Sequence, residues 1–100
     1  MTLNWSDHAI DKLREHIKYI AENSDLETAG KWLTGLYDNT SLIETFPSIA
    51  PVSHIPDLAE LGIHEMVYGN YRIFYIIREE DCRIISILNC RQNVTFVGDL

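Results

Sequence analysis

Gly69-Asn70-Tyr71-Arg72-Ile73-Phe74-Tyr75 combines a tight turn with the start of a β-strand. Gly-Asn between two apolar runs is typical of a two-residue hairpin turn, because both residues adopt positive φ at low cost. Aromatic and aliphatic side chains follow the turn, with one arginine, Arg72, among them. This arginine is either a surface charge of the strand or a residue placed to contact an anion.

The turn also fixes the register of the first hairpin. It predicts the pairs Tyr68–Tyr71, Val67–Arg72, Met66–Ile73, Glu65–Phe74, His64–Tyr75 and Ile63–Ile76. If the next loop, near Glu79-Glu80-Asp81, is also a two-residue turn, Arg72 lies opposite Asn89 and Ile77 lies opposite Ile84.

The first half of the chain predicts two helices. Ser6 is suited to cap the first helix, which ends near Asn23. Its apolar face has helical spacing and contains Ile10, Leu13, Ile17 and Ile20. A capping box, Ser24 with Glu27, begins the second helix, which runs through Ile43 and ends at Pro47.

Three strands are predicted at 63–68, 71–78 and 82–90, after a proline-containing loop at 47–62 with one helical turn at 57–60. A short strand at 2–5 begins the chain. The order β-α-α-β-β-β predicts a single α+β domain over residues 1–100. In this fold, two antiparallel helices pack on one face of a small antiparallel sheet.

Two helices cover only one face of this sheet, so a second face exposed to water should be polar. We predict that the helix-covered face holds Met66, Ile73, Tyr75, Ile77, Ile84 and Leu88. The second face is nevertheless apolar, with Ile63, Phe74, Ile76, Ile85 and Ile87 beside Arg72, Asn89 and Arg91. Its cover is the tail (Val94, Phe96 and Val97), a second subunit or a partner. The run Ile84-Ile85 leaves the faces of the last strand open, because a shift of one residue exchanges them.

Charge and composition restrict the class of function. The net charge is −7, which disfavours binding to free nucleic acid. The two cysteines, Cys82 and Cys90, lie at opposite ends of one strand, too far apart for an intrachain disulfide. The four histidines show no metal-binding spacing, and no cofactor motif or membrane-spanning run is present. We therefore expect a cytoplasmic protein without metal or cofactor.

The chain resembles the RelE/ParE superfamily of bacterial toxin–antitoxin toxins along nearly its whole length. The resemblance rests on Leu3-Asn4-Trp5, on Ala9, Leu13, Ile17, Tyr19-Ile20, Ala29 and Leu36, on Leu42 and Phe46-Pro47, on Gly69 to Tyr75, and on Ile85 to Asn89 before Arg91-Gln92. It implies the toxin of a type II, plasmid-stabilisation system, neutralised by a cognate antitoxin. The superfamily contains mRNA endonucleases that act on the ribosome and ParE-like inhibitors of DNA gyrase.

Three functions remain open from the resemblance. In the ribonuclease branch, Arg72 and Arg91 match arginines that stabilise phosphate charge. A late tyrosine of that branch is replaced by Phe96 or Val97, neither of which transfers protons. This difference favours a non-enzymatic, ParE-like toxin that contacts gyrase. The alternatives are a RelE-like endonuclease, or a degenerate homologue that binds antitoxin and has no activity.

The resemblance also suggests binding residues. The expected antitoxin-binding residues are Arg72, Phe74, Ile76, Ile85, Ile87 and Asn89. The expected target-binding residues are Arg91 and His64. The partners would be the antitoxin and either gyrase or the ribosome, with a homodimer as an option when antitoxin is absent.

Overall fold

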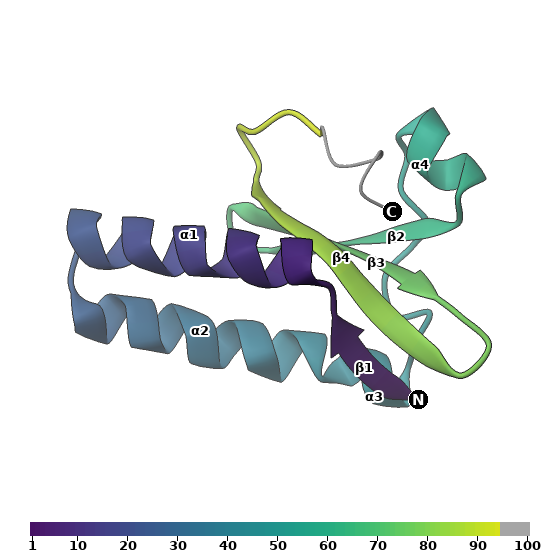
Figure 1. Ribbon diagram of the computed structural model, residues 1–100, viewed down its shortest axis with the longest axis horizontal. Helices are drawn as coiled ribbons and strands as arrows, with labels where there is room; N and C mark the ends of the chain where they lie inside the picture. Colours follow the sequence, from purple (N-terminus) through teal and green to yellow (C-terminus); the bar gives the residue numbers. More distant parts are fainter. Residues whose placement is uncertain (95–100) are drawn as a thin grey trace.

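The computed structural model describes residues 1–94 of the chain. The elements in order are β1 (Thr2–Trp5), α1 (Asp7–Asn23), α2 (Leu26–Thr40), α3 (Leu42–Thr45), α4 (Pro56–Glu60), β2 (Ile63–Tyr68), β3 (Tyr71–Ile77) and β4 (Asp81–Asn89). In Figure 1, α1 and α2 lie side by side and antiparallel, and α4 lies apart from them near the β2 end of the sheet. The predicted α+β class and the helix pair are confirmed.

The two long helices begin at side-chain caps. The Ser6 hydroxyl accepts a hydrogen bond from the backbone N–H of Ala9, at 3.0 Å, as predicted. The second cap is Asp25 and not Ser24: its carboxylate accepts from the N–H of Thr28 at 2.6 Å. This bond to the backbone lowers the pKa of Asp25, because it stabilises the ionised form.

The second helix ends earlier than predicted. It stops at Thr40, and the separate helix α3 contains Ile43. The hydroxyls of Thr40 and Ser41 donate to the carbonyls of Tyr37 and Asp38, three residues back in each case. Such bonds compete with the backbone pattern of a helix, which accounts for the interruption.

The sheet has the strand order β1-β4-β3-β2, and it is mostly but not wholly antiparallel. β1 pairs with β4 in parallel, from Thr2 opposite Asp81 to Trp5 opposite Ile84. The connection between these two strands includes both long helices, which lets the chain return in the same direction. The first strand therefore lies beside the last one (Figure 1).

The first hairpin has the predicted register, from Ile63 opposite Ile76 to Tyr68 opposite Tyr71. Gly69 has a φ of +57°, and no non-glycine residue within 1–94 has a positive φ. Positive φ at the first central position alone is the pattern of a type II′ turn, which requires glycine there.

The second hairpin differs from the predicted register. Arg72 lies opposite Leu88, one residue from the predicted partner, and Ile77 lies opposite Cys82, two residues away. The loop is at residues 79–80, because the N–H of Arg78 donates to the carbonyl of Asp81 at 2.8 Å. The prediction placed this loop one residue too late, which shifts the partner of Ile77 by two residues. The bulge further along β4 then reduces the difference to one residue at Arg72.

The bulge lies in the middle of β4. Phe74 pairs with Ser86 and Tyr75 pairs with Ile84, so Ile85 has no opposite residue on β3. A bulge places two consecutive side chains on the same side of a sheet and restarts the alternation beyond them.

The bulge changes the predicted composition of the two faces. Ile87, predicted on the second face, is fully buried in the core beneath α1 and α2, and Leu88 packs in the core on the other side. The other assignments are confirmed: Met66, Ile73, Tyr75, Ile77 and Ile84 on the helix side, and Ile63, Phe74, Ile76 and Ile85 on the second side.

The chain itself covers the second face. Leu58 of α4 is fully buried there, and Ile55 and Val94 pack against the same cluster. The one-turn helix at 57–60 was predicted, but its packing on this face was not. Val94 packs on this face, as predicted for the tail. Phe96 and Val97, the other predicted tail residues, lie outside the described residues. Burial of each large apolar side chain contributes about 1.5–3 kcal/mol, so this second core is a substantial part of the fold.

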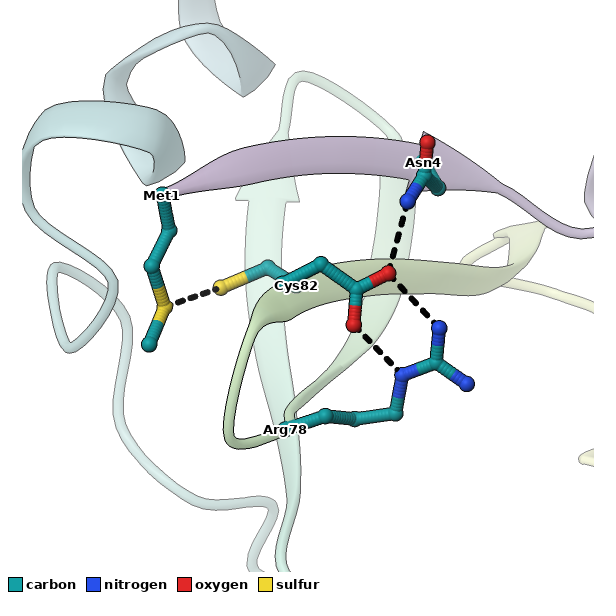
Figure 2. Close-up of polar contacts among 5 residues, drawn as sticks. Met1, Asn4, Arg78 and Cys82 are labelled. Carbon is teal, nitrogen blue, oxygen red and sulfur yellow. Dashed lines mark hydrogen bonds and ion pairs between the residues drawn. The ribbon is translucent and has the colours of Figure 1, made fainter.

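An ion pair stabilises the second hairpin, and a hydrogen bond to the same carboxylate stabilises its junction with β1. The Asp81 carboxylate accepts from Arg78 at 2.6 and 2.7 Å and from the Asn4 amide at 2.6 Å, and Figure 2 shows Asn4 and Arg78 converging. These bonds lower the pKa of Asp81 to about 2. Cys82 and Cys90 are both free, and the Cys82 thiol contacts the Met1 sulfur at 3.6 Å (Figure 2).

One helical glycine makes room for a tyrosine of the sheet. A Cβ at Gly35 would overlap the Tyr68 hydroxyl, which donates to the carbonyl of Trp32 at 3.0 Å. A Cβ at Gly30, on an exposed part of the same helix, would touch nothing. The structure shows that Gly35 faces a strand and that Gly30 has no such constraint.

We predict that Gly35→Ala destabilises the chain by about 1–3 kcal/mol relative to Gly30→Ala, because Tyr68 must move. Gly30→Ala should stabilise by up to about 1 kcal/mol, from helix propensity alone. Urea unfolding of the two variants tests this difference. In a Tyr68→Phe background, the penalty of Gly35→Ala should shrink; an equal penalty there would rule out the hydroxyl as the cause.

Candidate functional site

Arg72 lies on the second face of the sheet, beside Phe74. Its guanidinium carbon is 5.6 Å from the centre of the Phe74 ring, and its Nη2 donates to the carbonyl of Gln92 at 3.0 Å. The Nε atom is buried and has no hydrogen-bond partner within residues 1–94. Arg72 forms no ion pair with Glu65 there, because the Glu65 carboxylate accepts instead from the Ser53 hydroxyl. Within residues 1–94, the Arg72 guanidinium therefore retains capacity for an anion.

Asn89 and Arg91 do not share that face with Arg72. Asn89 lies opposite Tyr71, which belongs to the core under the helices, and both Asn89 and Arg91 line a groove next to α1. The prediction that Arg72, Asn89 and Arg91 form one cluster is wrong. Its cause is the register of β4: Arg72 pairs with Leu88, so the next residue belongs to the opposite side.

The predicted apolar antitoxin-binding residues are mostly enclosed in the free chain. Phe74 is fully buried and Ile85 nearly so, both in the core covered by α4 and Val94. Ile76 is partly exposed at the edge of this cluster. Ile87 is on the helix side and fully buried. A partner on the second face could reach Arg72 and Ile76 directly, but could reach Phe74 only if the cover moved.

His64 has structural partners. Its Nδ1 must donate to the carbonyl of Ala50, at 2.7 Å, since a carbonyl only accepts. Its ring stacks on Tyr75 with centroids 5.0 Å apart. The Tyr75 hydroxyl donates in turn to the carbonyl of Pro47 at 2.7 Å. These contacts hold the loop before α4 against the sheet, and they account for His64 without a role in target binding.

A groove of about 680 Å³ lies between α1 and the turn that follows β4. Its lining comes from three parts of the chain: Glu15, His16 and Tyr19 of α1; Asn70 and Tyr71 of the first hairpin; and Asn89, Cys90, Arg91 and Gln92. Of these, the sequence indicated Asn89 and Arg91 as binding residues. We refer to this set as the α1 groove.

His16 is the residue of the α1 groove that the sequence analysis missed. It is 6% exposed, and its Nε2 lies 2.7 Å from the carbonyl of Ile87. The signal for it was the helical spacing: His16 follows Ala9 by seven residues and Leu13 by three, on the buried face of α1. A histidine in an apolar stripe marks a buried polar group that needs a partner, but the sequence could not show that β4 supplies it.

The surroundings of His16 keep it neutral. Burial is the main cause of its lowered pKa, because a charged ring loses hydration; the bond to the Ile87 carbonyl opposes this in part. The ring also lies edge-on to Tyr71, with centroids 4.9 Å apart. Since Nε2 carries the proton given to Ile87, Nδ1 is an acceptor with no hydrogen-bond partner in the described part of the chain.

The groove and the rest of the described chain offer no site for a metal. Within residues 1–94, no group of three or more His, Cys, Asp or Glu side chains could hold an ion. In the same range, no helix is both long and apolar enough to span a membrane.

One comparison with known proteins identifies a family, and a second finds the same fold. A model of the family described as "ParE toxin of type II toxin-antitoxin system, parDE" matches residues 3–94. A solved structure described as "Chromosomal ParDE TA system from P. aeruginosa" has the same fold, with a TM-score of 0.75 and 14% identity over 89% of this chain and 95% of that chain. At this identity the structural match shows the fold alone. A search of curated proteins found no match.

We predict that stability falls as the pH drops below about 6.5, because the unfolded chain protonates His16 before the folded chain does. The slope from this group can reach about 1.4 kcal/mol per pH unit. His16→Gln keeps a donor for the Ile87 carbonyl and should remove this part of the slope. Urea unfolding between about pH 5 and 8 tests it.

The matched control is His54→Gln, since His54 is exposed in the loop before α4. This substitution should leave the pH dependence of the free energy of unfolding as it is in the wild type. Equal slopes in the wild type and in His16→Gln would show that His16 does not resist protonation in the folded chain.

Proposed function

The chain belongs to the family of ParE toxins of type II toxin–antitoxin systems, and we propose that it inhibits DNA gyrase by protein–protein contact and is neutralised by a cognate antitoxin. The observation that carries this proposal is the family match over residues 3–94. The net charge of −7 agrees with a protein target better than with a phosphate backbone.

The alternative is a RelE-like endonuclease that acts on the ribosome, and one observation favours it. The α1 groove contains Arg91 together with titratable side chains, His16 and Tyr71, that the sequence did not bring together. Such groups can stabilise charge and transfer protons. Against this reading, Glu15 lies in the same groove and would repel a phosphate, and Arg72 lies on the other face.

Induction of the chain in bacterial cells separates these functions. We predict that DNA synthesis stops before protein synthesis, measured by incorporation of labelled thymidine and methionine, and that the purified chain inhibits supercoiling by gyrase. Co-expression of the antitoxin should prevent the arrest of DNA synthesis in these cells. Cleavage of mRNA at defined codons would instead support the endonuclease, and normal growth would support a degenerate homologue that only binds antitoxin.

For the antitoxin, we propose that one of its carboxylates contacts Arg72 on the second face of the sheet. Support comes from the guanidinium itself, whose Nε has no hydrogen-bond partner within residues 1–94 and which forms no ion pair there. Ile76, four residues further along β3 and partly exposed, offers an apolar contact. The buried Phe74 and Ile85 would be reached only after displacement of the segment with Val94.

We predict that Arg72→Ala weakens antitoxin binding at least tenfold, since hydrogen bonds to charged groups contribute about 1.5–3 kcal/mol. Isothermal titration calorimetry with the purified antitoxin measures the loss. Arg83→Ala is the control: Arg83 is exposed on β4 and forms no ion pair within residues 1–94. Unchanged affinity in Arg72→Ala, with the fold intact by circular dichroism, would disprove this contact.

A further inference from the structure

The α1 groove lies on the opposite side of the sheet from Arg72. Tyr71 in its wall belongs to the core under the helices, whereas α4 and Val94 pack on the other core. Within residues 1–94 the segments that cover the second core do not cover the groove, so a partner bound near Arg72 leaves the groove accessible.

The turn after β4 presents hydrogen-bond donors to the groove. The N–H of Gln92 donates to the carbonyl of Asn89 at 2.9 Å, which closes the turn. The side-chain oxygens of both residues are also used: Asn89 Oδ1 accepts from the N–H of Arg91 at 3.0 Å, and Gln92 Oε1 accepts from the N–H of Asn89 at 2.8 Å. Because backbone N–H groups only donate, these bonds fix which end of each amide is oxygen.

Three donor groups near this turn have no partner among residues 1–94. Within residues 1–94, the side-chain NH₂ groups of Asn89 and Gln92 make no hydrogen bond. In the same range, the Arg91 guanidinium forms no ion pair. All three residues line the groove. A cation flanked by two amide donors suits a carboxylate, which only accepts.

The groove also offers an acceptor and aromatic surface. His16 Nδ1 is an acceptor that has no partner in the described part of the chain, on a side chain that is more than nine-tenths buried. Tyr71 forms part of the wall, and Tyr19 on α1 is 61% exposed. An exposed tyrosine next to a hydrogen-bonding groove is typical of surfaces that bind proteins.

We propose that the α1 groove binds an acidic segment of the toxin's target protein. A carboxylate of that segment contacts Arg91, Asn89 and Gln92, a donor group contacts His16 Nδ1, and an adjacent aromatic or aliphatic side chain packs on Tyr19 and Tyr71. A nucleic acid fits less well, because the groove has one arginine and an acidic residue, Glu15, in a chain of net charge −7. The role in target binding rests on the proposed function, whereas the binding of an acidic peptide does not.

The peptide chemistry is tested on the purified chain by NMR titration. The probe is N-acetyl-Glu-Phe-amide, and the matched probe is N-acetyl-Gln-Phe-amide. The Glu peptide should bind with a Kd of about 1–10 mM and shift the amide signals of Tyr71 and of the turn at 89–92. The Gln peptide should bind at least tenfold more weakly.

The variants locate the contact. Arg91→Ala should abolish the shifts caused by the Glu peptide, and Arg83→Ala, the same change at the other end of β4, should leave them unchanged. Absence of shifts in the wild type, equal shifts in Arg91→Ala, or stronger binding of inorganic phosphate than of the Glu peptide would each overturn the proposed peptide site.

The role in target binding is tested by growth arrest on induction. Arg91→Ala should require about tenfold to a hundredfold more chain for the same arrest, the range expected for losing a hydrogen-bonded charge. It should still bind the antitoxin as the wild type does. A wild-type chain that does not arrest growth would contradict the proposed function alone. A toxic wild type with an equally toxic Arg91→Ala would overturn this role of the groove.

Discussion

The bulge in β4 decides which side chains lie on each side of the sheet. Ile84 and Ile87 both face the helices although they are three residues apart, because Ile85 between them has no partner on β3. Ile85 and Leu88 consequently pack on the other side, with α4. Both sides of the sheet thus obtain an apolar core, and Asn89 and Arg91, which follow the bulge, line the α1 groove on the opposite side of the sheet from Arg72.

The first hairpin could be predicted from the sequence, whereas the second could not. Gly69-Asn70 defines the first turn, and the residues on both sides alternate with a period of two, so one register satisfies both signals. Along β4, Ile84-Ile85 and Ile87-Leu88 give no period. The local fit between strands decides instead: the small Ser86 lies opposite the large, fully buried Phe74. That match depends on packing beneath α4, which no local sequence pattern encodes.

The register of β4 also explains why only some of the candidate binding residues were placed correctly. Sequence alternation correctly assigned Arg72 to the second face with Phe74 and Ile76, because that inference depended only on the first hairpin. The position of Arg91 depended on β4 and was predicted wrongly. The α1 groove needed a third piece of information, the contact of His16 with Ile87, which joins positions 71 residues apart. Such contacts arise from the way α1 crosses the sheet and leave no trace in residue spacing.

The turn at Asn89–Gln92 connects the two faces physically. Its Gln92 carbonyl accepts from Arg72 on one side, while the Gln92 side chain accepts from the N–H of Asn89 at the groove. A carboxylate that took Nη2 of Arg72 would compete with the Gln92 carbonyl for that donor, and the turn would lose one of its restraints. Because coupling between two sites is reciprocal, a ligand that orders the turn from the groove would in return hold Arg72 in its contact with Gln92. If antitoxin and target bind opposite faces as proposed, each would then weaken the binding of the other without sharing a surface with it.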